Sequence, residues 1–215
     1  CAAFAFVKNT QLSKQELAER AFHIETKKLG FLTGKQDAYA ASYGGINLFH
    51  FGPGERFEVE TVDVSDELLN QFKKTVILLY IGGNRTAKNI QRMLSTATRH
   101  TSRFKALTQL KQQAIQIKDL LQNGDFDGFG NVLHQSWKAK KKSNPLVTNQ
   151  RIDKIYREAL SSGALGGKLC GAGEAGYMIF VVDPTRRKGI IDNLKKLGCV
   201  NIDMQFSFTG VTLKN

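Results

Sequence analysis

A glycine-rich turn between two strand-forming segments most limits the folds open to this chain. Residues 171–176 read GAGEAG and match the pattern G-x-G-x-x-G. A dinucleotide-binding fold requires a helix directly after this pattern, so that the helix N-terminus meets the pyrophosphate. Here the next residues, 177–182, read YMIFVV and are strand-forming. The sequence therefore predicts a hairpin around the turn and excludes a Rossmann fold.

The same turn also differs from other phosphate-binding loops. The V-A-I-K, H-R-D and D-F-G motifs of protein kinases do not occur in the chain, and neither does a P-loop. Two interpretations of the turn stay open. Its small residues could let backbone N–H groups converge on a phosphate, or they could serve a tight hairpin that needs positive φ.

Local patterns elsewhere predict a mixture of helices and antiparallel strands. A capping box at residues 13–16 opens a helix that ends at Gly30, and residues 30–45 are rich in turn formers. Residues 46–51 and 56–62 alternate around a Gly-Pro-Gly turn, which predicts a hairpin. The remaining expected elements are a strand at 75–81, helical sequence at 85–123, helices at 126–141, 148–163 and 184–197, strands at 168–170 and 177–182, and a last strand at 202–208. This order predicts an α+β fold.

Charge and composition narrow the range of partners. The net charge of +12 favours an anionic partner, such as a phosphorylated metabolite, nucleic acid or acidic lipid. No apolar run approaches the roughly 18 residues that a membrane span needs. The three cysteines are too few for a disulfide framework or a zinc site, which suits a reducing cytoplasm. The densest basic run, at residues 138–142, is expected on the solvated end of a helix.

Residues 1–7, CAAFAFV, resemble the inside of a buried helix. They have neither an initiator Met nor the charged start of a signal peptide. We therefore expect the natural chain to continue upstream of Cys1.

Four segments, in order along the chain, resemble motifs of the GHMP kinases, a superfamily of small-molecule kinases. Residues 163–173, GALGGKLCGAG, resemble the third conserved motif of the superfamily. Residues 34–45, GKQDAYAASYGG, resemble the segment with the catalytic aspartate and look most like the heptose 7-phosphate kinase branch. YIGGNR at 80–85 and WKAKK at 137–141 are similar to the same branch. Together these segments identify the chain as a member of the superfamily.

The chain departs from the family pattern at three positions. Glu174 and Ala175 stand where the third motif usually has glycines, and Ala38 stands where the heptose branch has Gln. A carboxylate close to phosphate groups is electrostatically unfavourable. Glu174 therefore raises the question of whether the glycine-rich turn touches the nucleotide.

The resemblance implies a GHMP kinase-like α+β fold made of two domains. Residues 1–70 would be the remnant of a ribosomal-S5-domain-2-like N-terminal catalytic domain. Residues 71–215 would form a ferredoxin-like C-terminal domain. The phosphate loop of the family's second motif would lie just before residue 1.

The resemblance also implies an activity, with ATP and Mg²⁺ as cofactors and a sugar phosphate as substrate. The reaction would phosphorylate the anomeric hydroxyl of D-glycero-D-manno-heptose 7-phosphate to give the 1,7-bisphosphate. Such a reaction asks the protein to position the reactants, to hold a metal on the phosphates and to deprotonate or orient the hydroxyl.

Specific residues can be assigned to these tasks by the same resemblance. Asp37 would be the catalytic carboxylate, against the alternative of a turn former among glycines. Glu25 would bind Mg²⁺, against the alternative of an i,i+3 pair with Lys28 on a solvated face. The expected substrate-binding residues are Lys35, Gln36, Tyr39, Arg85 and Lys168. The expected ATP-binding residues are Gly171, Ala172 and Gly173.

Three alternatives stay open. The chain could be another GHMP kinase, such as a fucokinase-like enzyme, or a catalytically incomplete fragment that lacks its phosphate loop. It could also be a basic nucleic-acid-binding module, although its basic residues lack the interleaved aromatic residues of RNA-binding motifs. Salt-dependent retention on RNA or DNA would favour that last alternative. A membrane is not expected as a partner, whereas a homodimer is compatible with the resemblance.

Overall fold

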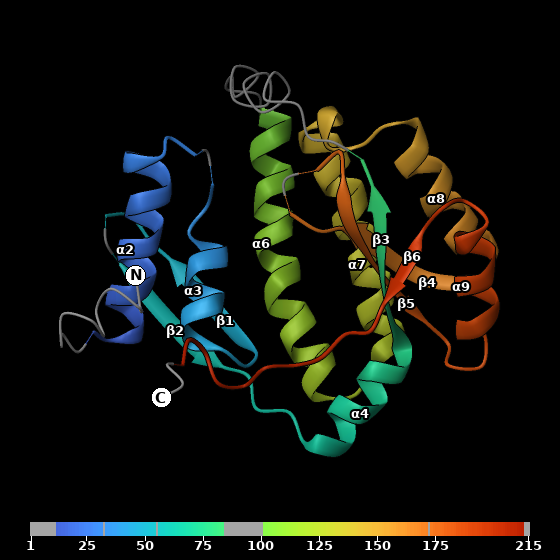
Figure 1. The fold of residues 1–215 in the computed structure, drawn as a ribbon, viewed down its shortest axis with the longest axis horizontal. Helices are drawn as coiled ribbons and strands as arrows, with labels where there is room; N and C mark the ends of the chain where they lie inside the picture. Colours follow the sequence, from blue (N-terminus) through green and yellow to red (C-terminus); the bar gives the residue numbers. More distant parts are fainter. Residues whose placement is uncertain (1–11, 32, 55, 84–100, 172, 213–215) are drawn as a thin grey trace. The chain divides into compact units, whose positions relative to one another are not determined.

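The structure is a computed structural model of the chain. It describes residues 12–31, 33–54, 56–83, 101–171 and 173–212, with side chains from residue 105 in the fourth range. The described residues form two compact units (Figure 1). Unit 1 contains the residues up to Asp63 and those from Gln205 onward, and unit 2 runs from Val64 to Met204. The C-terminal segment therefore does not group with the rest of the predicted domain 71–215.

Unit 1 begins with the helix that the capping box predicted. In α2 (Lys14–His23), the Ser13 hydroxyl accepts a hydrogen bond from the Glu16 backbone N–H, and the Glu16 carboxylate accepts one from the Ser13 N–H at 2.8 Å. The helix continues into a π-helical turn, η1 (Ile24–Lys28). It ends before Gly30, whose φ of +69° suits glycine. The predicted helix from the capping box to Gly30 is thus confirmed.

A second helix, α3 (Gln36–Tyr43), occupies the stretch that was predicted as turns. That prediction is wrong because the turn-forming glycines lie at the ends of the segment, whereas its middle contains alanines, which favour a helix. The helix stops at Gly44, where a Cβ atom would overlap the backbone of Gly210. The Gly45 N–H also donates to the Ser207 carbonyl at 2.8 Å. These contacts hold the C-terminal segment on unit 1.

The predicted hairpin of unit 1 is confirmed. Strands β1 (Asn47–Phe51) and β2 (Phe57–Thr61) pair antiparallel, with Asn47 opposite Thr61. Aromatic rings from this hairpin surround Tyr39 of α3, and the closest ring centroid, that of Phe57, lies 4.5 Å from its own. The other rings around Tyr39 are those of Tyr43, Phe49 and Phe51.

Unit 2 is built on a four-stranded antiparallel sheet with the strand order β4-β5-β3-β6. The strands are β3 (Val76–Gly82), β4 (Ala164–Leu169), β5 (Gly176–Val182) and β6 (Val200–Ile202). Strands β4 and β5 flank the glycine-rich turn, so the hairpin that the sequence predicted there is confirmed. The last strand was predicted at 202–208 and ends instead at Ile202, because the chain then leaves the sheet for unit 1.

Helices α8 (Gln150–Ser161) and α9 (Arg187–Lys195) share one core with the sheet (Figure 1). Ile77, Leu79 and Phe180 point to this core from one sheet face and are fully buried. Helix α7 (Phe126–Ser143) contributes Trp137 to the same core and runs beside α6 (Thr101–Gln122).

One helix of unit 2 was missed by the sequence analysis. Helix α4 (Asp66–Thr75) leads into β3, and the Ser65 hydroxyl accepts a hydrogen bond from the Leu68 N–H at its start. Acidic residues fill its first turn and basic residues its last, as the helix dipole favours. The sequence therefore contained a helix signal, namely the capping Ser65 and these charges, directly before the strand pattern at which the domain boundary was placed.

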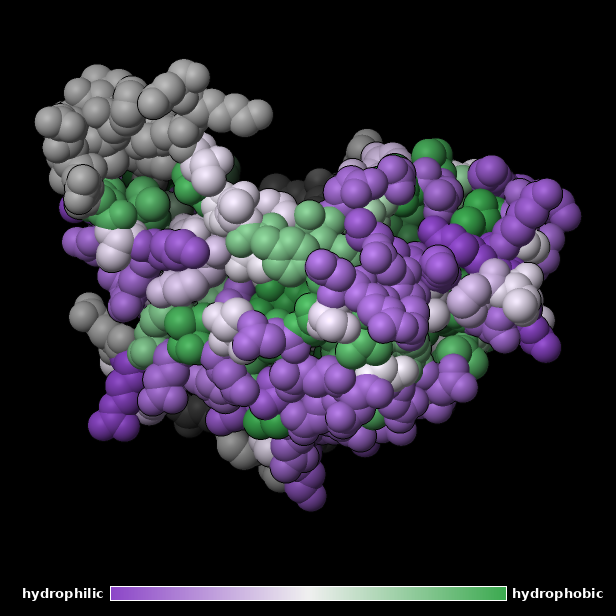
Figure 2. All heavy atoms as spheres, turned by 90° about the horizontal axis from the view of Figure 1, so that it is seen from below, coloured by the Kyte–Doolittle hydropathy of each residue, from purple (hydrophilic) through white to green (hydrophobic). Residues whose placement is uncertain are grey.

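The described surface carries many charged side chains. The face in Figure 2 is mostly hydrophilic, with smaller hydrophobic areas between the charged groups. Among the described residues, the structure contains no helix long and apolar enough to cross a bilayer.

We expect acid to destabilise the protein partly through His134. Its Nδ1 atom lies 2.7 Å from the Tyr156 hydroxyl oxygen. Burial, with smaller effects of Lys138 and Lys141, lowers the pKa of His134 in the folded state. In the unfolded chain His134 becomes protonated near pH 6.5, whereas in the folded chain it stays neutral to a lower pH. Protonation therefore favours the unfolded chain, and stability is lost as the pH falls through about 6.5 toward the folded pKa.

Urea unfolding at pH values of about 7.5 and about 5.5 measures this effect. His134→Gln should show a smaller loss of stability at the lower pH than the unchanged chain. An identical loss in both proteins would show that His134 does not contribute.

Candidate active site

Asp37 lies in the first turn of α3, exposed to solvent, where a negative side chain is favourable. Lys35 directly precedes this helix and is half-buried. Its Nζ atom lies 5.8 Å from the ring centroid of Phe22 and 5.9 Å from that of Phe51, distances at which a cation is attracted to an aromatic face. The two rings thereby fix the ammonium group of Lys35, a residue two positions before Asp37 in the sequence.

Glu25 lies on η1, the continuation of α2, and α2 packs beside α3 (Figure 1). Its side chain is half-buried, and its backbone carbonyl accepts a hydrogen bond from the Phe31 N–H at 2.8 Å. In the described part of the chain, Glu25 forms no ion pair with Lys28, which was the alternative interpretation. Within the same part, no three His, Cys, Asp or Glu side chains cluster as a metal site would need.

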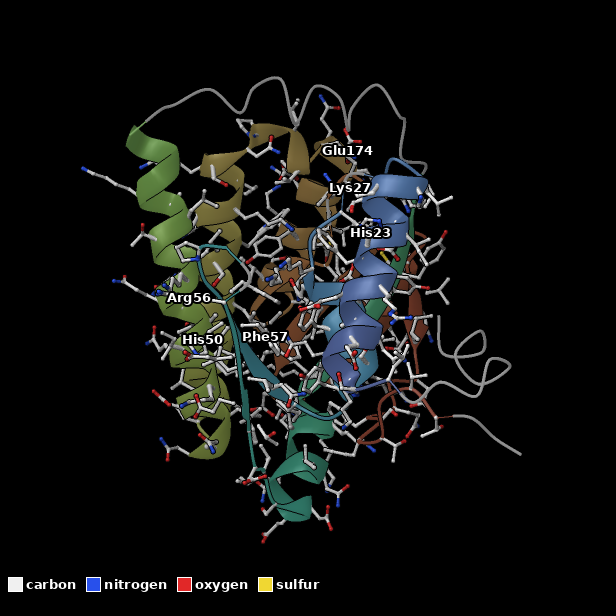
Figure 3. The ribbon with its side chains drawn as sticks, turned by 90° about the vertical axis from the view of Figure 1, so that its left-hand side faces the viewer. His23, Lys27, His50, Arg56, Phe57 and Glu174 are labelled. Atoms are coloured by element: carbon white, nitrogen blue, oxygen red, sulfur yellow. The ribbon has the colours of Figure 1, made fainter. Side chains whose placement is uncertain are left out.

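Two basic side chains accompany Glu25 on this helix. His23 ends α2 and Lys27 follows four residues later on η1, and both are exposed (Figure 3). They lie on neighbouring turns of the same helical segment. Lys27 and Lys28 together outnumber the one carboxylate of Glu25, so this end of the helix carries a net positive charge.

Tyr39, a predicted substrate-binding residue, lies in the interior of unit 1. Its side chain is fully buried, and its hydroxyl donates to the Glu19 carboxylate at 3.3 Å. This burial favours a packing role for Tyr39, and its contact with a substrate stays a prediction. The residue fixes α3 against α2 and the aromatic rings of the hairpin.

The other predicted substrate-binding residues belong to different units or lie outside the described residues. Gln36 is exposed at the start of α3. Lys168 belongs to unit 2, where it lies on β4 opposite Ile179 and is half-buried. Arg85 lies outside the described residues, as does Cys1 with the segment that was expected to follow a phosphate loop.

Several backbone N–H and C=O groups of the glycine-rich turn form hydrogen bonds within unit 2. The Lys140 ammonium donates to the carbonyl of Gly171 at 2.7 Å and to that of Leu169 at 3.4 Å. The Glu174 N–H donates to the Val147 carbonyl at 3.1 Å, and the Ala175 N–H donates to Gly173 at 2.9 Å. Two N–H groups that could have met a phosphate are therefore already satisfied.

Close packing explains why Gly173 must be glycine. Its φ is +122°, and a Cβ atom there would lie 2.8 Å from the Cα atom of Val147. Glu174 also has a positive φ of 66°, and no other described non-glycine residue does. These features favour a tight turn packed on the segment between α7 and α8. They do not support ATP binding by Gly171 and Gly173 through converging N–H groups, and Ala172 lies outside the described residues.

Sequence analysis missed two sets of contacts, one around Lys35 and one at the glycine-rich turn. Phe22 and Phe51 flank Lys35, although they are far from each other in the sequence. Lys140 holds the glycine-rich turn from α7. The resemblance of residues 137–141 to the heptose kinase branch was the available signal for Lys140, whereas no local pattern pointed to the two phenylalanines.

The fold and the motif-like segments can be compared with known protein families. Residues 117–198 match the family model described as GHMP kinases C terminal. The chain therefore contains a GHMP kinase C-terminal domain, and the predicted GHMP kinase-like α+β fold is confirmed.

Among curated proteins, the chain is 33% identical to the D-glycero-alpha-D-manno-heptose 7-phosphate kinase of Campylobacter jejuni. The match covers 97% of this chain and 62% of that enzyme. The chain is also 29% identical to the L-fucokinase/L-fucose-1-P guanylyltransferase of Bacteroides fragilis, over 80% of this chain and 18% of that protein.

Solved structures of sugar kinases are also similar to this chain. A D-glycero-D-manno-heptose 1-phosphate kinase from Bacteroides thetaiotaomicron has a TM-score of 0.74 at 27% identity, covering 99% of this chain and 60% of its own. A putative sugar kinase from Campylobacter jejuni has a TM-score of 0.71 at 32% identity, covering 97% and 59%. The galactokinase of Lactococcus lactis, at 15% identity, a TM-score of 0.67 and coverage of 97% and 62%, shares the fold.

Proposed function

We propose that this chain belongs to an ATP-dependent kinase that phosphorylates the anomeric hydroxyl of D-glycero-D-manno-heptose 7-phosphate, giving the 1,7-bisphosphate. The observation that carries the proposal is the 33% identity, over 97% of this chain, to a relative that bears the name of this kinase. The fucokinase relatives are less similar, at 25% and 29% identity. The chain covers 62% of the heptose kinase relative, so the activity is proposed for the product of the complete reading frame.

In the proposed reaction, Asp37 accepts the proton of the anomeric hydroxyl. The oxygen then forms a bond to the γ-phosphorus of ATP, and the bond from that phosphorus to ADP breaks. The exposure of Asp37 supports this role, because the carboxylate is accessible to a hydroxyl group. Lys35, held between two aromatic rings, would supply a positive charge near the oxygen that becomes negative.

The proposed metal site uses Glu25. Magnesium in phosphoryl-transfer enzymes takes one or two protein carboxylates, and the substrate phosphates and water supply its other ligands. A single half-buried carboxylate on η1 fits this donor set, even though the described residues form no larger acidic cluster. When bound, Mg²⁺ would neutralise negative charge on the phosphates of ATP.

Glu25→Gln should raise the concentration of Mg²⁺ that gives half-maximal activity by about tenfold, because the amide lacks the charge that attracts the cation. Initial rates over a Mg²⁺ series at saturating ATP measure this shift. Glu67→Gln, at an exposed glutamate of α4, is the control and should leave the series unchanged. An unchanged requirement in Glu25→Gln would return Glu25 to a surface role.

A substrate comparison tests the proposed function. ADP release by the product of the complete reading frame is measured with heptose 7-phosphate, the unphosphorylated heptose and L-fucose. We expect kcat/KM for heptose 7-phosphate to exceed the other two by about 10- to 100-fold, the value of one or two charge-assisted contacts to the 7-phosphate. Preference for L-fucose would favour the fucokinase-like alternative.

A cytoplasmic location and a homodimer are also part of the proposal. A cytoplasmic location agrees with the phosphorylated substrates and with Cys170 and Cys199, which are free thiols. A homodimer would be recognised in solution by light scattering as twice the mass of the chain. A mass of one chain would reject it.

A further inference from the structure

A cavity of about 650 Å³ in unit 2 has no part in the proposed reaction. It opens between the end of α7 and the first turns of α8, and it shares no residue with the candidate active site. Its volume is in the range of small-molecule sites. The lining residues are Lys141, Gln150, Asp153, Lys154, Tyr156 and Arg157.

One wall of the cavity is held by several contacts. The Lys141 ammonium donates to Asp153 Oδ1 at 3.1 Å, and the Thr148 hydroxyl donates to the same oxygen at 3.0 Å. Lys141 Nζ also lies 5.7 Å from the ring centroid of Trp137, which is fully buried, and 5.9 Å from that of Tyr156. This wall is therefore ordered before any ligand arrives.

The aromatic part of the lining has no negative charge at neutral pH. Burial raises the pKa of Tyr156 to about 12, so its phenol keeps its proton. Its hydroxyl also lies 2.7 Å from Nδ1 of His134, which anchors the ring. Asp153 is the sole carboxylate in the lining, and Lys141 neutralises it.

Positive charge remains on the α8 side. Lys154 and Arg157 are three residues apart on α8, so they lie on one face of the helix, and both are exposed. The lining holds three cations and one carboxylate, which leaves an excess of two positive charges. Gln150, the first residue of α8, adds an amide donor at the helix end that attracts anions.

We propose that this cavity binds a small phosphorylated anion. Arg157 can form paired hydrogen bonds with a phosphate group, and Lys154 adds a point charge beside it. The paired Lys141 and Asp153 form the fixed wall against which the ligand rests. The site would let a phosphorylated metabolite bind this protein independently of the reaction at Asp37.

Trp137 offers a local signal for the test, because it is the sole tryptophan of the sequence and contacts Lys141. Inorganic pyrophosphate is titrated into the chain at constant ionic strength while the fluorescence of Trp137 is recorded. The variant Lys154→Gln with Arg157→Gln removes the two unmatched charges. The control, Lys188→Gln with Lys196→Gln, removes two exposed charges at α9, outside the cavity.

We expect a saturable fluorescence change, at least about tenfold weaker pyrophosphate binding in the α8 variant, and a change below about twofold in the control. Equal weakening in both variants would overturn the proposal in favour of general charge attraction. Binding that the α8 variant leaves unaffected, or no saturable change at all, would overturn it as well.

Discussion

Asp37→Asn should lower kcat by about two to four orders of magnitude, the size of a general-base contribution, while KM for ATP should change by less than about threefold. Asparagine has the same shape as aspartate but cannot accept the proton of the sugar hydroxyl. Because Asp37 is exposed in the first turn of α3, its replacement removes no buried contact. Steady-state kinetics on the product of the complete reading frame measure both constants.

The control for this prediction is Asp66→Asn. Asp66 is also an exposed aspartate in the first turn of a helix, α4, so the substitution changes charge and helix-dipole interaction in the same way. Its kcat should stay within about twofold of the unchanged protein. Near-normal turnover in Asp37→Asn would remove Asp37 from the mechanism, whatever the control shows.

Gly166→Ala should lower the free energy of unfolding by about 3 kcal/mol, the upper part of the range for an overpacked core. Gly166 is buried on β4, where α7 crosses the sheet edge. A Cβ atom there would overlap the carbonyl oxygen of Gly130 and lie 3.0 Å from the Cβ atom of His134. The strand and the helix must separate to admit it, because a backbone oxygen cannot rotate away as a side chain can.

Gly189→Ala is the matched control for stability. Gly189 lies in α9, is exposed, and would meet nothing within 4 Å of an added Cβ atom. The same chemical change should stabilise the protein by about 0.5–1 kcal/mol, since alanine favours a helix more than glycine does. Urea unfolding of both variants measures the difference. A loss below about 0.5 kcal/mol for Gly166→Ala would show that α7 and β4 are not packed as described.

Elements with strong local signals could be predicted from the sequence. The capping box before α2, the Gly-Pro-Gly hairpin and the apolar strand β3 depend on neighbouring residues, and each was found. Helix α3 was missed because the glycines at its ends outweighed the short alanine-containing middle. The strand β6 was misplaced because strand-forming residues after Ile202 pack on unit 1 instead of extending the sheet.

The candidate site likewise has features that are local in the sequence and features that depend on tertiary packing. Asp37 and Lys35 are close in the sequence, and one family motif contains both. The pair of rings around Lys35 depends on how α2 and the hairpin pack, which no local pattern records. Gly173 likewise owes its identity to Val147, a residue of a different segment. Its role in packing could therefore be recognised only in the folded chain.

Phosphorus NMR of the reaction product tests the central proposal most directly. The product of the complete reading frame is incubated with ATP, Mg²⁺ and heptose 7-phosphate, and the phosphorus signals are followed to completion. The proposed activity predicts ADP together with a second phosphomonoester signal coupled to the anomeric proton. ADP with free phosphate alone, or a second phosphate on any carbon other than the anomeric one, would contradict it.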